Sequence, residues 1–307
     1  MEQEKKVILL AGPTASGKSE LAIKLAQHFN GEIINADSMQ VYKEISILTS
    51  KPSIKDERII KHHLYGFNSV KKNFSTGRWL KMTVKIIEKQ LENKKMPIVV
   101  GGTGLYFKAL TDGLVKIPNI PPNVRTEVRK LYKKIGSKKF FTKLIKLDPL
   151  AKKYILPTDS QRSIRAYEVK KFTNKSLFEL TKKTKSNFEN GIFKKLFINT
   201  PKDVLHKKID KKVDSMFNQG AVDEVTNFYK MKINKELSPN KIIGIKEIGD
   251  YLNGKISLIQ AKELIKQKTR QYTKRQFTWA RGHMKSWEMI YSHNINDLYK
   301  KAINKIF

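Results

Sequence analysis

Eight residues near the start of the sequence match the phosphate-binding pattern G-x-x-x-x-G-K-[ST]. They are Gly12, Pro13, Thr14, Ala15, Ser16, Gly17, Lys18 and Ser19. Glycines in this pattern let backbone N–H groups converge on phosphate oxygens, and the start of the following helix adds positive potential. Lys18 then supplies a positive charge and Ser19 a hydroxyl ligand for Mg²⁺. The pattern predicts a cradle for a diphosphate or triphosphate, as in nucleotide-binding and ATP-binding proteins.

Two further candidate positions follow apolar runs that have the character of strands. Asp37 follows the run at 32–36, whereas the run at 97–100 ends in Gly101-Gly102-Thr103-Gly104. An NTPase of this kind places a Mg²⁺-binding aspartate after the second of these strands, and that carboxylate is missing here. Because open α/β sheets bind ligands at the carboxyl ends of their strands, we expect Asp37 beside the phosphate loop, where it can act as a general base. The alternative is that Asp37 starts a loop and caps the next turn.

Strands and helices must alternate to position these residues. Strands are predicted at 7–11, 32–36, 97–100 and 195–199, and helices at 18–29 and 77–93. Runs this apolar are typical of strands that are buried on both faces of a parallel sheet. The sequence therefore predicts an α/β fold with a P-loop NTPase-like parallel sheet core.

The pattern changes after Gly113. Pro118, Pro121 and Pro122 mark a linker, and from there to about Asn190 only helical patterns rich in lysine follow. We therefore expect three segments. They are 1–115 as the first part of the P-loop core, 116–194 as an all-helical insert domain, and 195–307 as the second, mostly helical part of the core.

Composition limits the kind of protein. The chain has 307 residues, of which 39% are hydrophobic, enough for one large domain or two linked ones. Its apolar runs are far shorter than the ~18 residues that a membrane helix needs. It has no cysteine, which excludes disulfides, thiolate metal sites and a cysteine nucleophile. Six residues precede the first strand-like run, so we expect no targeting peptide, no membrane span and a cytoplasmic protein.

The charge is strongly positive. Lys and Arg number 62 against 28 Asp and Glu, a formal net charge of +34, which suggests a polyanionic partner such as nucleic acid. The alternative is a general drift toward lysine. Only nine of the basic residues are arginines, whose planar, bidentate side chain lysine does not replace. The arginines at 125–129, 162–165 and 270–281 are therefore candidate contacts, unless they are ordinary residues of helix surfaces.

Six motifs, spread along nearly the whole chain, resemble those of one family, the tRNA dimethylallyltransferases of bacterial type, also called tRNA isopentenyltransferases. The motifs are the phosphate pattern at 12–19, Asp37-Ser38-Met39-Gln40-Val41-Tyr42, Gly101-Gly102-Thr103-Gly104-Leu105-Tyr106, Gln161-Arg162-Ser163-Ile164-Arg165-Ala166-Tyr167-Glu168-Val169, Gly244-Ile245-Lys246-Glu247 and Lys274-Arg275-Gln276-Phe277-Thr278-Trp279-Ala280-Arg281. This family transfers a dimethylallyl group from dimethylallyl diphosphate to the exocyclic N6 amine of the adenosine just 3′ of the anticodon, with Mg²⁺.

The resemblance implies roles for individual residues. The phosphate loop would hold the diphosphate leaving group, with Ser19 at the Mg²⁺ site. Asp37 would take the proton from the adenine amine, and Thr14 would lie close to the reacting centre. Contacts with the tRNA anticodon stem-loop would come from Asp37, Ser38, Met39, Gln40, Thr103, Arg125, Gln161, Arg162, Ser163, Ile164 and Arg165. The insert would bind tRNA, and the protein would be a monomer.

Some of these positions have structural alternatives. Arg162 and Arg165 could form ion pairs with Asp159 or Glu168 instead of contacting RNA. Where relatives often carry an arginine before Val-Asp-x-Met, this chain has Lys212, so a bidentate anion contact is in doubt there. The adjacent pair His62-His63 lacks the i, i+4 spacing of helical zinc ligands.

Three other functions compete with this one. A P-loop kinase of a nucleoside or small metabolite would share the cradle and an aspartate base, but the charge of +34 and the lysine-rich insert disfavour it. An isopentenyltransferase acting on free adenine nucleotides would not need a platform of ~70 residues for RNA. A noncatalytic RNA-binding protein would not need to keep Lys18, Ser19, Asp37 and Thr103.

Overall fold

The computed structural model describes residues 6–182, 184–189 and 191–306. The chain divides into two compact units, Met1–Thr111 with Phe188–Phe307, and Asp112–Asn187. We call them the sheet unit and the helical unit. The insert expected at 116–194 overlaps the helical unit and differs from it at both bounds. The expected absence of a targeting peptide concerns residues 1–5, which lie outside the described residues, as do Lys183 and Asn190.

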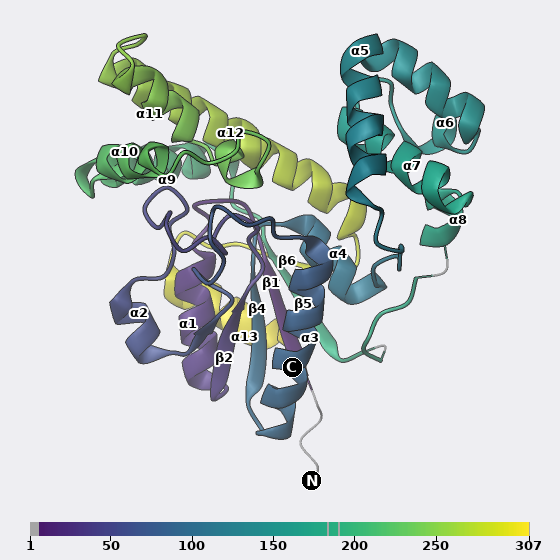
Figure 1. Ribbon diagram of the computed structural model, residues 1–307. Helices are drawn as coiled ribbons and strands as arrows, with labels where there is room; N and C mark the ends of the chain where they lie inside the picture. The colour runs from purple at the N-terminus through teal and green to yellow at the C-terminus, as the bar shows by residue number, and fades with distance from the viewer. Residues whose placement is uncertain (1–5, 183, 190, 307) are drawn as a thin grey trace. The chain divides into compact units, whose positions relative to one another are not determined.

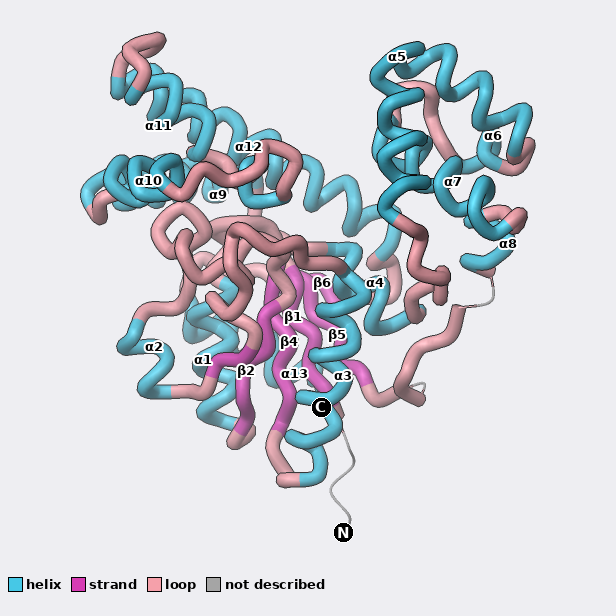
Figure 2. Tube along the Cα trace, viewed as in Figure 1, coloured by secondary structure: helices cyan, strands magenta, loops and turns pink. Residues whose placement is uncertain are grey.

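The sheet unit is built on a six-stranded sheet with the strand order β3-β2-β4-β1-β5-β6 (Figures 1 and 2). The strands are β1 (Val7–Ala11), β2 (Gly31–Asn35), β3 (His62–His63), β4 (Met96–Gly101), β5 (Phe193–Ile198) and β6 (Glu288–Ile290). Every neighbouring pair is parallel. Because the strands all run in one direction, the loops after their carboxyl ends gather at one edge of the sheet.

Helices cover both faces of this sheet, so its strands are buried on both sides (Figure 1). One face carries α1 (Lys18–His28) and α13 (Ile295–Ile306), and the other carries α3 (Thr76–Glu92) and α4 (Gly104–Asp112). Side chains alternate along a strand, so β1 contributes Ile8 and Leu10 to the first core and Leu9 to the second. Leu25 packs in the first core and Trp79 in the second. This double burial accounts for the continuous apolar runs in the sequence.

A layer of helices lies over the carboxyl edge of the sheet (Figure 1). It consists of α9 (Lys202–Asn218), α10 (Ala221–Lys230), the 3₁₀ helix η1 (Ser238–Lys241), α11 (Ile245–Leu252) and α12 (Leu258–His283). A third core joins this layer to the segment after β2, with Ile209, Phe228 and Ile248 packed together with Val41 and Ile45. The short helix α2 (Ile54–Ile59) follows this segment. The layer thereby brings residues from the C-terminal half over the loops of the sheet.

The helical unit has a small core of its own. Its helices are α5 (Pro122–Leu147), α6 (Ala151–Tyr154), α7 (Ser160–Thr173) and α8 (Leu177–Thr181). Leu144 on α5 packs with Ala166 on α7, together with Ala151 and Ile155. Gly136 interrupts α5 with φ 74° and ψ 170°, a backbone conformation outside the helical region. In neither unit does a described helix have the length and apolar character needed to cross a membrane.

The predicted fold class is confirmed, with one correction at the C-terminal end. Only helices were expected after the strand at 195–199, but β6 adds a sixth strand, paired with β5 through Phe197 and Met289. The two-residue strand β3 at the opposite edge was also not predicted. Both strands are short, and β6 buries only Ile290, so neither produces the apolar run that identifies the central strands.

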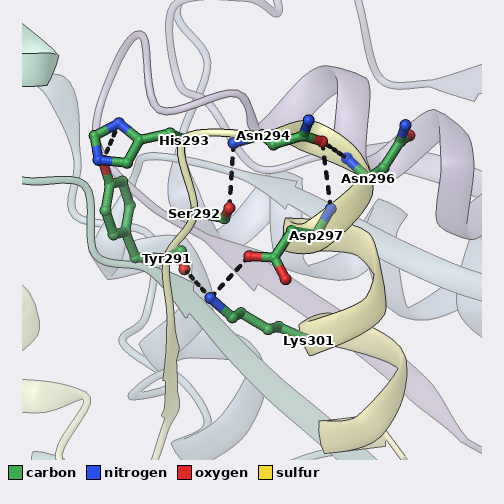
Figure 3. A network of polar contacts seen from close by, with 7 residues as sticks. All are labelled: Tyr291, Ser292, His293, Asn294, Asn296, Asp297 and Lys301. Carbon is green, nitrogen blue, oxygen red and sulfur yellow. Dashed lines mark hydrogen bonds and ion pairs between the residues drawn. The ribbon is translucent and has the colours of Figure 1, made fainter.

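Short-range polar contacts fix the turn between β6 and α13 (Figure 3). The Asn294 side chain accepts a hydrogen bond from the backbone of Asp297 at 3.4 Å. Lys301 donates to the backbone oxygen of Tyr291 at 3.1 Å and pairs with Asp297 at 2.8 Å. These contacts order the first turns of α13, whose apolar side packs on the sheet.

Candidate active site

Three neighbouring loops carry the predicted site residues of the sheet unit. The phosphate loop (12–19) follows β1, the Asp37 turn (37–40) follows β2, and the Gly102 turn (102–104) follows β4. Since β4 lies between β1 and β2, these loops emerge side by side at the carboxyl edge. Open α/β sheets bind ligands at this edge, and the sequence predicts that the site residues lie there.

The phosphate loop has the turn that its pattern requires. Gly17, which precedes α1, has φ +89°, a conformation that residues with a side chain rarely adopt. Lys18 folds back over the loop and donates from Nζ to the backbone oxygen of Pro13 at 2.6 Å. The hydroxyl of Ser16 is buried and has no hydrogen-bond partner within the described part of the chain. The loop thus presents a helix start, a lysine and an unpartnered hydroxyl together.

Two lysines of the site have depressed pKa values. Burial lowers the pKa of Lys18 to about 7, the charge of Lys212 acts in the same direction, and the charge of Asp37 opposes both. Burial also lowers the pKa of Lys212, again opposed by Asp37. Each ammonium group would be stabilised by an anion bound beside it. The electrostatics of the site therefore favour a ligand with concentrated negative charge.

Asp37 lies in a tightly bonded turn. Its backbone N–H donates to Oδ1 of Asn35 at 2.7 Å, and its own Oδ1 accepts from the backbone N–H of Met39 at 2.9 Å. Asn35 is buried, and its backbone oxygen accepts a hydrogen bond from Trp79 Nε1 at 2.7 Å. Among the described residues, none donates a hydrogen bond to the second carboxylate oxygen of Asp37. Asp37 therefore caps its turn with one oxygen while the other can face a ligand.

The rest of the Asp37 turn is bonded to two other segments. The N–H of Ser38 donates to Oγ1 of Thr103 at 2.9 Å, which links this turn to the Gly102 turn. Gln40 donates from Nε2 to the backbone oxygens of Thr49 and Ser50 at 2.9 Å and 2.8 Å. These contacts restrict the position of the Asp37 turn relative to the Gly102 turn and to the segment at Thr49 and Ser50.

The phosphate loop and Asp37 line one cavity of about 460 Å³. Of the predicted residues, those that line it are Thr14, Ala15, Ser16, Gly17, Lys18, Ser19, Asp37, Met39 and Gln40. Apolar lining comes from Leu48, Ile209, Val213, Met216, Ile242, Ile243 and Ile265, and further cationic lining from Lys212, Lys241 and Arg275. Gly12, Pro13, Ser38 and Thr103 are not among its lining residues. Such a cavity suits a ligand that has both an anionic and an apolar part.

The remaining predicted RNA contacts lie in the helical unit, on α5 and α7. Arg125, Gln161 and Arg162 are exposed, Ile164 and Arg165 are partly buried, and Ser163 is buried. A direct contact of Ser163 with RNA would require its neighbours to move. The exposed members of this set are available to a large partner.

Ion pairs hold several of these arginines. Arg162 Nε lies 3.5 Å from Asp159, and Arg165 lies 3.6 Å from the buried carboxylate of Glu168. Arg129 approaches the same carboxylate at 3.8 Å. The ion pairs with Asp159 and Glu168, which were the alternative to RNA contacts for Arg162 and Arg165, are therefore present. Because exposed ion pairs contribute only about 0–1 kcal/mol, Arg162 can exchange Asp159 for a phosphate at little cost. Arg165 would leave a buried carboxylate, so its exchange costs more.

Two residues outside the predicted set fix the loops of the site. Glu224, on α10, accepts hydrogen bonds from the backbone N–H groups of Ser46, Ile47 and Leu48 at 2.6–3.0 Å. Gln276, on α12, accepts from the N–H of Thr14 at 3.0 Å. No local pattern singles out Glu224, whereas Gln276 lies within the last of the six sequence motifs.

Tyr65 and Tyr272, which also line the cavity, were not predicted either. Burial raises the pKa of each phenol above its ordinary value, and the charge of Asp37 adds to this effect. Both hydroxyls therefore keep their protons near neutral pH and can act only as neutral donors or acceptors.

The donor set for a metal ion is sparse. Within the described residues, no group of three or more His, Cys, Asp or Glu side chains could hold a metal ion. Ser19 is exposed at the start of α1 and lines the cavity. Mg²⁺ usually keeps several waters and binds through one or two protein groups together with substrate phosphates. Ser19 fits a magnesium ion that arrives with a diphosphate.

These features define a class of protein. The phosphate loop lies between β1 and α1 of a parallel sheet, which makes this a P-loop α/β protein. Glycines stand in place of an acid after β4. The cavity also contains a carboxylate and an apolar wall. The family model described as IPP transferase matches residues 40–283. The chain belongs to this family.

Similar proteins support the assignment over nearly the whole chain. The chain is 53% identical to a tRNA dimethylallyltransferase of Pelagibacter ubique, over 98% of this chain and 96% of that one. It is 44% identical to a tRNA dimethylallyltransferase of Rickettsia massiliae, over 92% of this chain and 78% of that one.

Solved structures agree with the fold. The tRNA isopentenylpyrophosphate transferase of Bacillus halodurans matches with a TM-score of 0.70 at 29% identity, over 98% of this chain and 97% of that one. A eukaryotic dimethylallyltransferase acting on tRNA matches with a TM-score of 0.82 at 29% identity, over 98% of this chain and 77% of that one.

Proposed function

We propose that this protein transfers a dimethylallyl group from dimethylallyl diphosphate to the N6 amine of the adenosine just 3′ of the anticodon in tRNA, releasing diphosphate. One observation carries the proposal: Asp37 and the phosphate loop line the same cavity, which also has an apolar wall. A diphosphate, an isoprenoid chain and an amine that must lose a proton match these three parts. The names of the relatives, tRNA dimethylallyltransferase, support the same activity.

The chemistry is a substitution at the allylic carbon. The N6 nitrogen forms a bond to C1 of the donor, and the bond from C1 to oxygen breaks with its electron pair leaving on the diphosphate. The proton of N6 passes to the carboxylate of Asp37. An adenine amine is a weak nucleophile, so this general base should contribute about 10²–10⁴-fold to the rate.

The phosphate loop stabilises the departing group. Negative charge grows on the diphosphate in the transition state, and the backbone of the loop, Lys18 and Lys212 present positive potential to it. No residue is needed to position a water molecule. The apolar lining, including Leu48 and Ile265, packs on the dimethylallyl group and keeps water from the allylic carbon.

We infer that Mg²⁺ binds together with the donor. Ser19 would be its protein ligand, with diphosphate oxygens and waters completing the shell. When bound, the ion neutralises charge on the diphosphate.

The acceptor must be a base that can leave its stack. An adenine reaches a cavity at the edge of a sheet only when it is flipped out, which favours a loop nucleotide over a paired one. The Asp37 turn with Thr103 would contact the flipped base, and Arg125, Gln161, Arg162 and Arg165 of the helical unit the anticodon stem. We propose that the protein acts as a monomer in the cytoplasm.

Intact RNA mass tests this function. The protein is incubated with dimethylallyl diphosphate, Mg²⁺ and an unmodified anticodon stem-loop that has consecutive adenosines, without ATP. The expected product is RNA heavier by one C5H8 unit. A parallel incubation supplies ATP or GTP instead of the donor. Hydrolysis of the nucleotide there, with no five-carbon gain on the RNA in the first reaction, would overturn the proposal in favour of an NTP-using enzyme. A stem-loop with guanosine at the acceptor position is the control and should gain no mass.

A further inference from the structure

One buried carboxamide joins two loops of the site. Gln276 is 8% exposed and comes from α12, far along the chain from both loops. Its Oε1 accepts from the backbone N–H of Thr14 at 3.0 Å, and its Nε2 donates to the backbone oxygen of Gly102 at 3.1 Å. One side chain therefore satisfies a donor in the phosphate loop and an acceptor in the Gly102 turn at once.

The contact continues to the Asp37 turn. Thr103, next to Gly102, donates from its backbone N–H to Ala36 at 3.1 Å, and its hydroxyl accepts from the N–H of Ser38 at 2.9 Å. Asp37 lies between Ala36 and Ser38. The Gln276 carboxamide is thus linked to both ends of the site, the phosphate loop directly and the Asp37 turn through Thr103.

The backbone leaves room for this carboxamide. A Cβ atom on Gly102 would lie 2.2 Å from Nε2 of Gln276, and its next nearest neighbour outside that side chain would be the backbone oxygen of Gly12 at 3.4 Å. An alanine at 102 would therefore displace the carboxamide and little else. Gln276 itself does not line the cavity, so it touches no substrate there.

We propose that Gln276 is a positioning residue, whose carboxamide sets the spacing between the phosphate loop and Asp37 and so aligns the leaving group with the general base. This inference rests on the proposed transferase function. The role needs one acceptor and one donor at fixed separation, which a carboxamide has and a carboxylate lacks. Because both substrates bind through other groups, loss of the contact should lower kcat more than it weakens binding of either substrate.

A double-mutant cycle tests the proposal in the full-length protein. Gln276→Ala and Gly102→Ala should each lower kcat by about 10–10²-fold, the size of effect that small misplacements produce, with KM for the donor and affinity for RNA within a few-fold of wild type. In the Gln276→Ala background, Gly102→Ala should add almost nothing, because the side chain that it displaces is already gone. Additive losses, or a wild-type kcat in either single variant, would overturn the proposal.

Two further variants separate positioning from general stability. Gln276→Glu keeps the length and the acceptor for Thr14 but removes the donor to Gly102, so it should be impaired in kcat. Gln267→Glu, on an exposed side of the same helix, is the control and should match wild type. Should Gln276→Ala unfold in thermal melts, Gly102→Ala, which retains the glutamine, and Gln276→Glu still decide the question through the split between kcat and KM. If wild type itself fails to alkylate RNA, the transferase function is wrong; if wild type is active and the variants are too, only this inference is wrong.

Discussion

The positive charges of the sheet unit and of the helical unit differ in their exposure to solvent. In the cavity of the sheet unit, burial lowers the pKa of Lys18 and Lys212, so their charge is costly until an anion arrives. In the helical unit, Arg129 and Arg162 are exposed, Arg165 is partly buried, and each of the three lies near a carboxylate. Desolvated charge suits a compact ligand held at a fixed point, whereas exposed, exchangeable charge suits the long phosphate backbone of RNA.

The largest expected effect is on the rate of the chemical step, with binding of the donor and of the RNA nearly unchanged. Asp37→Asn should lower the single-turnover rate by about 10²-fold or more, because the amide cannot take the N6 proton. RNA and donor affinities should stay within a few-fold, since the amide oxygen can still accept the hydrogen bond from Met39. Rapid-quench assays with saturating substrates measure the rate. A near-normal rate would remove Asp37 from the reaction.

Lys18→Met should weaken donor binding by about 10²-fold, since it removes a poorly solvated charge from the anion site. In wild type, Lys18 has a pKa of about 7 before binding, and the diphosphate raises it. Above that pH the complex must take up a proton, so donor affinity should fall as pH rises by up to about tenfold per unit.

Calorimetry of donor binding in two buffers with different ionisation heats measures this proton uptake. Subtracting the Lys18→Met result separates the lysine from titration of the diphosphate itself. Equal proton uptake by wild type and variant would show that Lys18 is already charged before the donor binds. That result would contradict the contrast drawn between the buried lysines and the exposed arginines.

The helical unit should show the opposite behaviour, dependence on salt. RNA affinity should fall with a log–log salt slope steeper than about −3 if four or more phosphates are engaged. Changing Arg125, Arg162 and Arg165 together to glutamine should make the slope shallower by about 2–3 if each contacts a phosphate. Fluorescence anisotropy with a labelled stem-loop measures both.

Arg58→Gln is the matched control for the arginine variants, because Arg58 is exposed on α2 of the sheet unit. It should leave the slope unchanged. If the triple variant keeps the slope of wild type, the arginines serve only their ion pairs, and the basic charge of the helical unit has another purpose.

The smallest expected effect is at Lys212, where the resemblance suggests that relatives often carry an arginine. Lys212→Arg should change donor KM only a few-fold near neutral pH, because the charge is kept. At alkaline pH it should bind the donor better than wild type, since a guanidinium does not lose its proton. Donor KM across a pH series checks this. A pH profile identical to that of wild type would mean that Lys212 does not contact the diphosphate.

Local patterns were enough to predict the central part of the fold. Glycine spacing predicted the phosphate loop, and apolar runs predicted the strands β1, β2, β4 and β5. Each of these elements depends on a few adjacent residues, so a short stretch of sequence is enough to identify it. The ion pairs of Arg162 and Arg165 could also be foreseen, since their partners lie three residues away on the same helix or its cap. The edge strand β6, exposed and three residues long, carries no such signal.

Contacts between distant segments could not be predicted in this way. Glu224 binds three N–H groups of a loop near residue 47, and Gln276 binds Thr14, with most of the chain between the partners. The residues adjacent to Glu224 or Gln276 in the sequence do not indicate which distant segment each side chain will contact in the folded protein. The depressed pKa of Lys18 is of the same kind, because it follows from burial in the folded protein and from the charge of Lys212, which is distant in the sequence.

The central claim is that the phosphate loop holds a leaving group during transfer to RNA, and the stoichiometry of diphosphate release tests it most directly. Diphosphate and alkylated adenosine are quantified together, with donor and Mg²⁺, in the presence and absence of the stem-loop. We predict one diphosphate per alkylated adenosine when RNA is present and almost none when it is absent, because the apolar lining of the cavity keeps water from the allylic carbon. Comparable diphosphate release without RNA, or release that exceeds alkylation, would contradict the account.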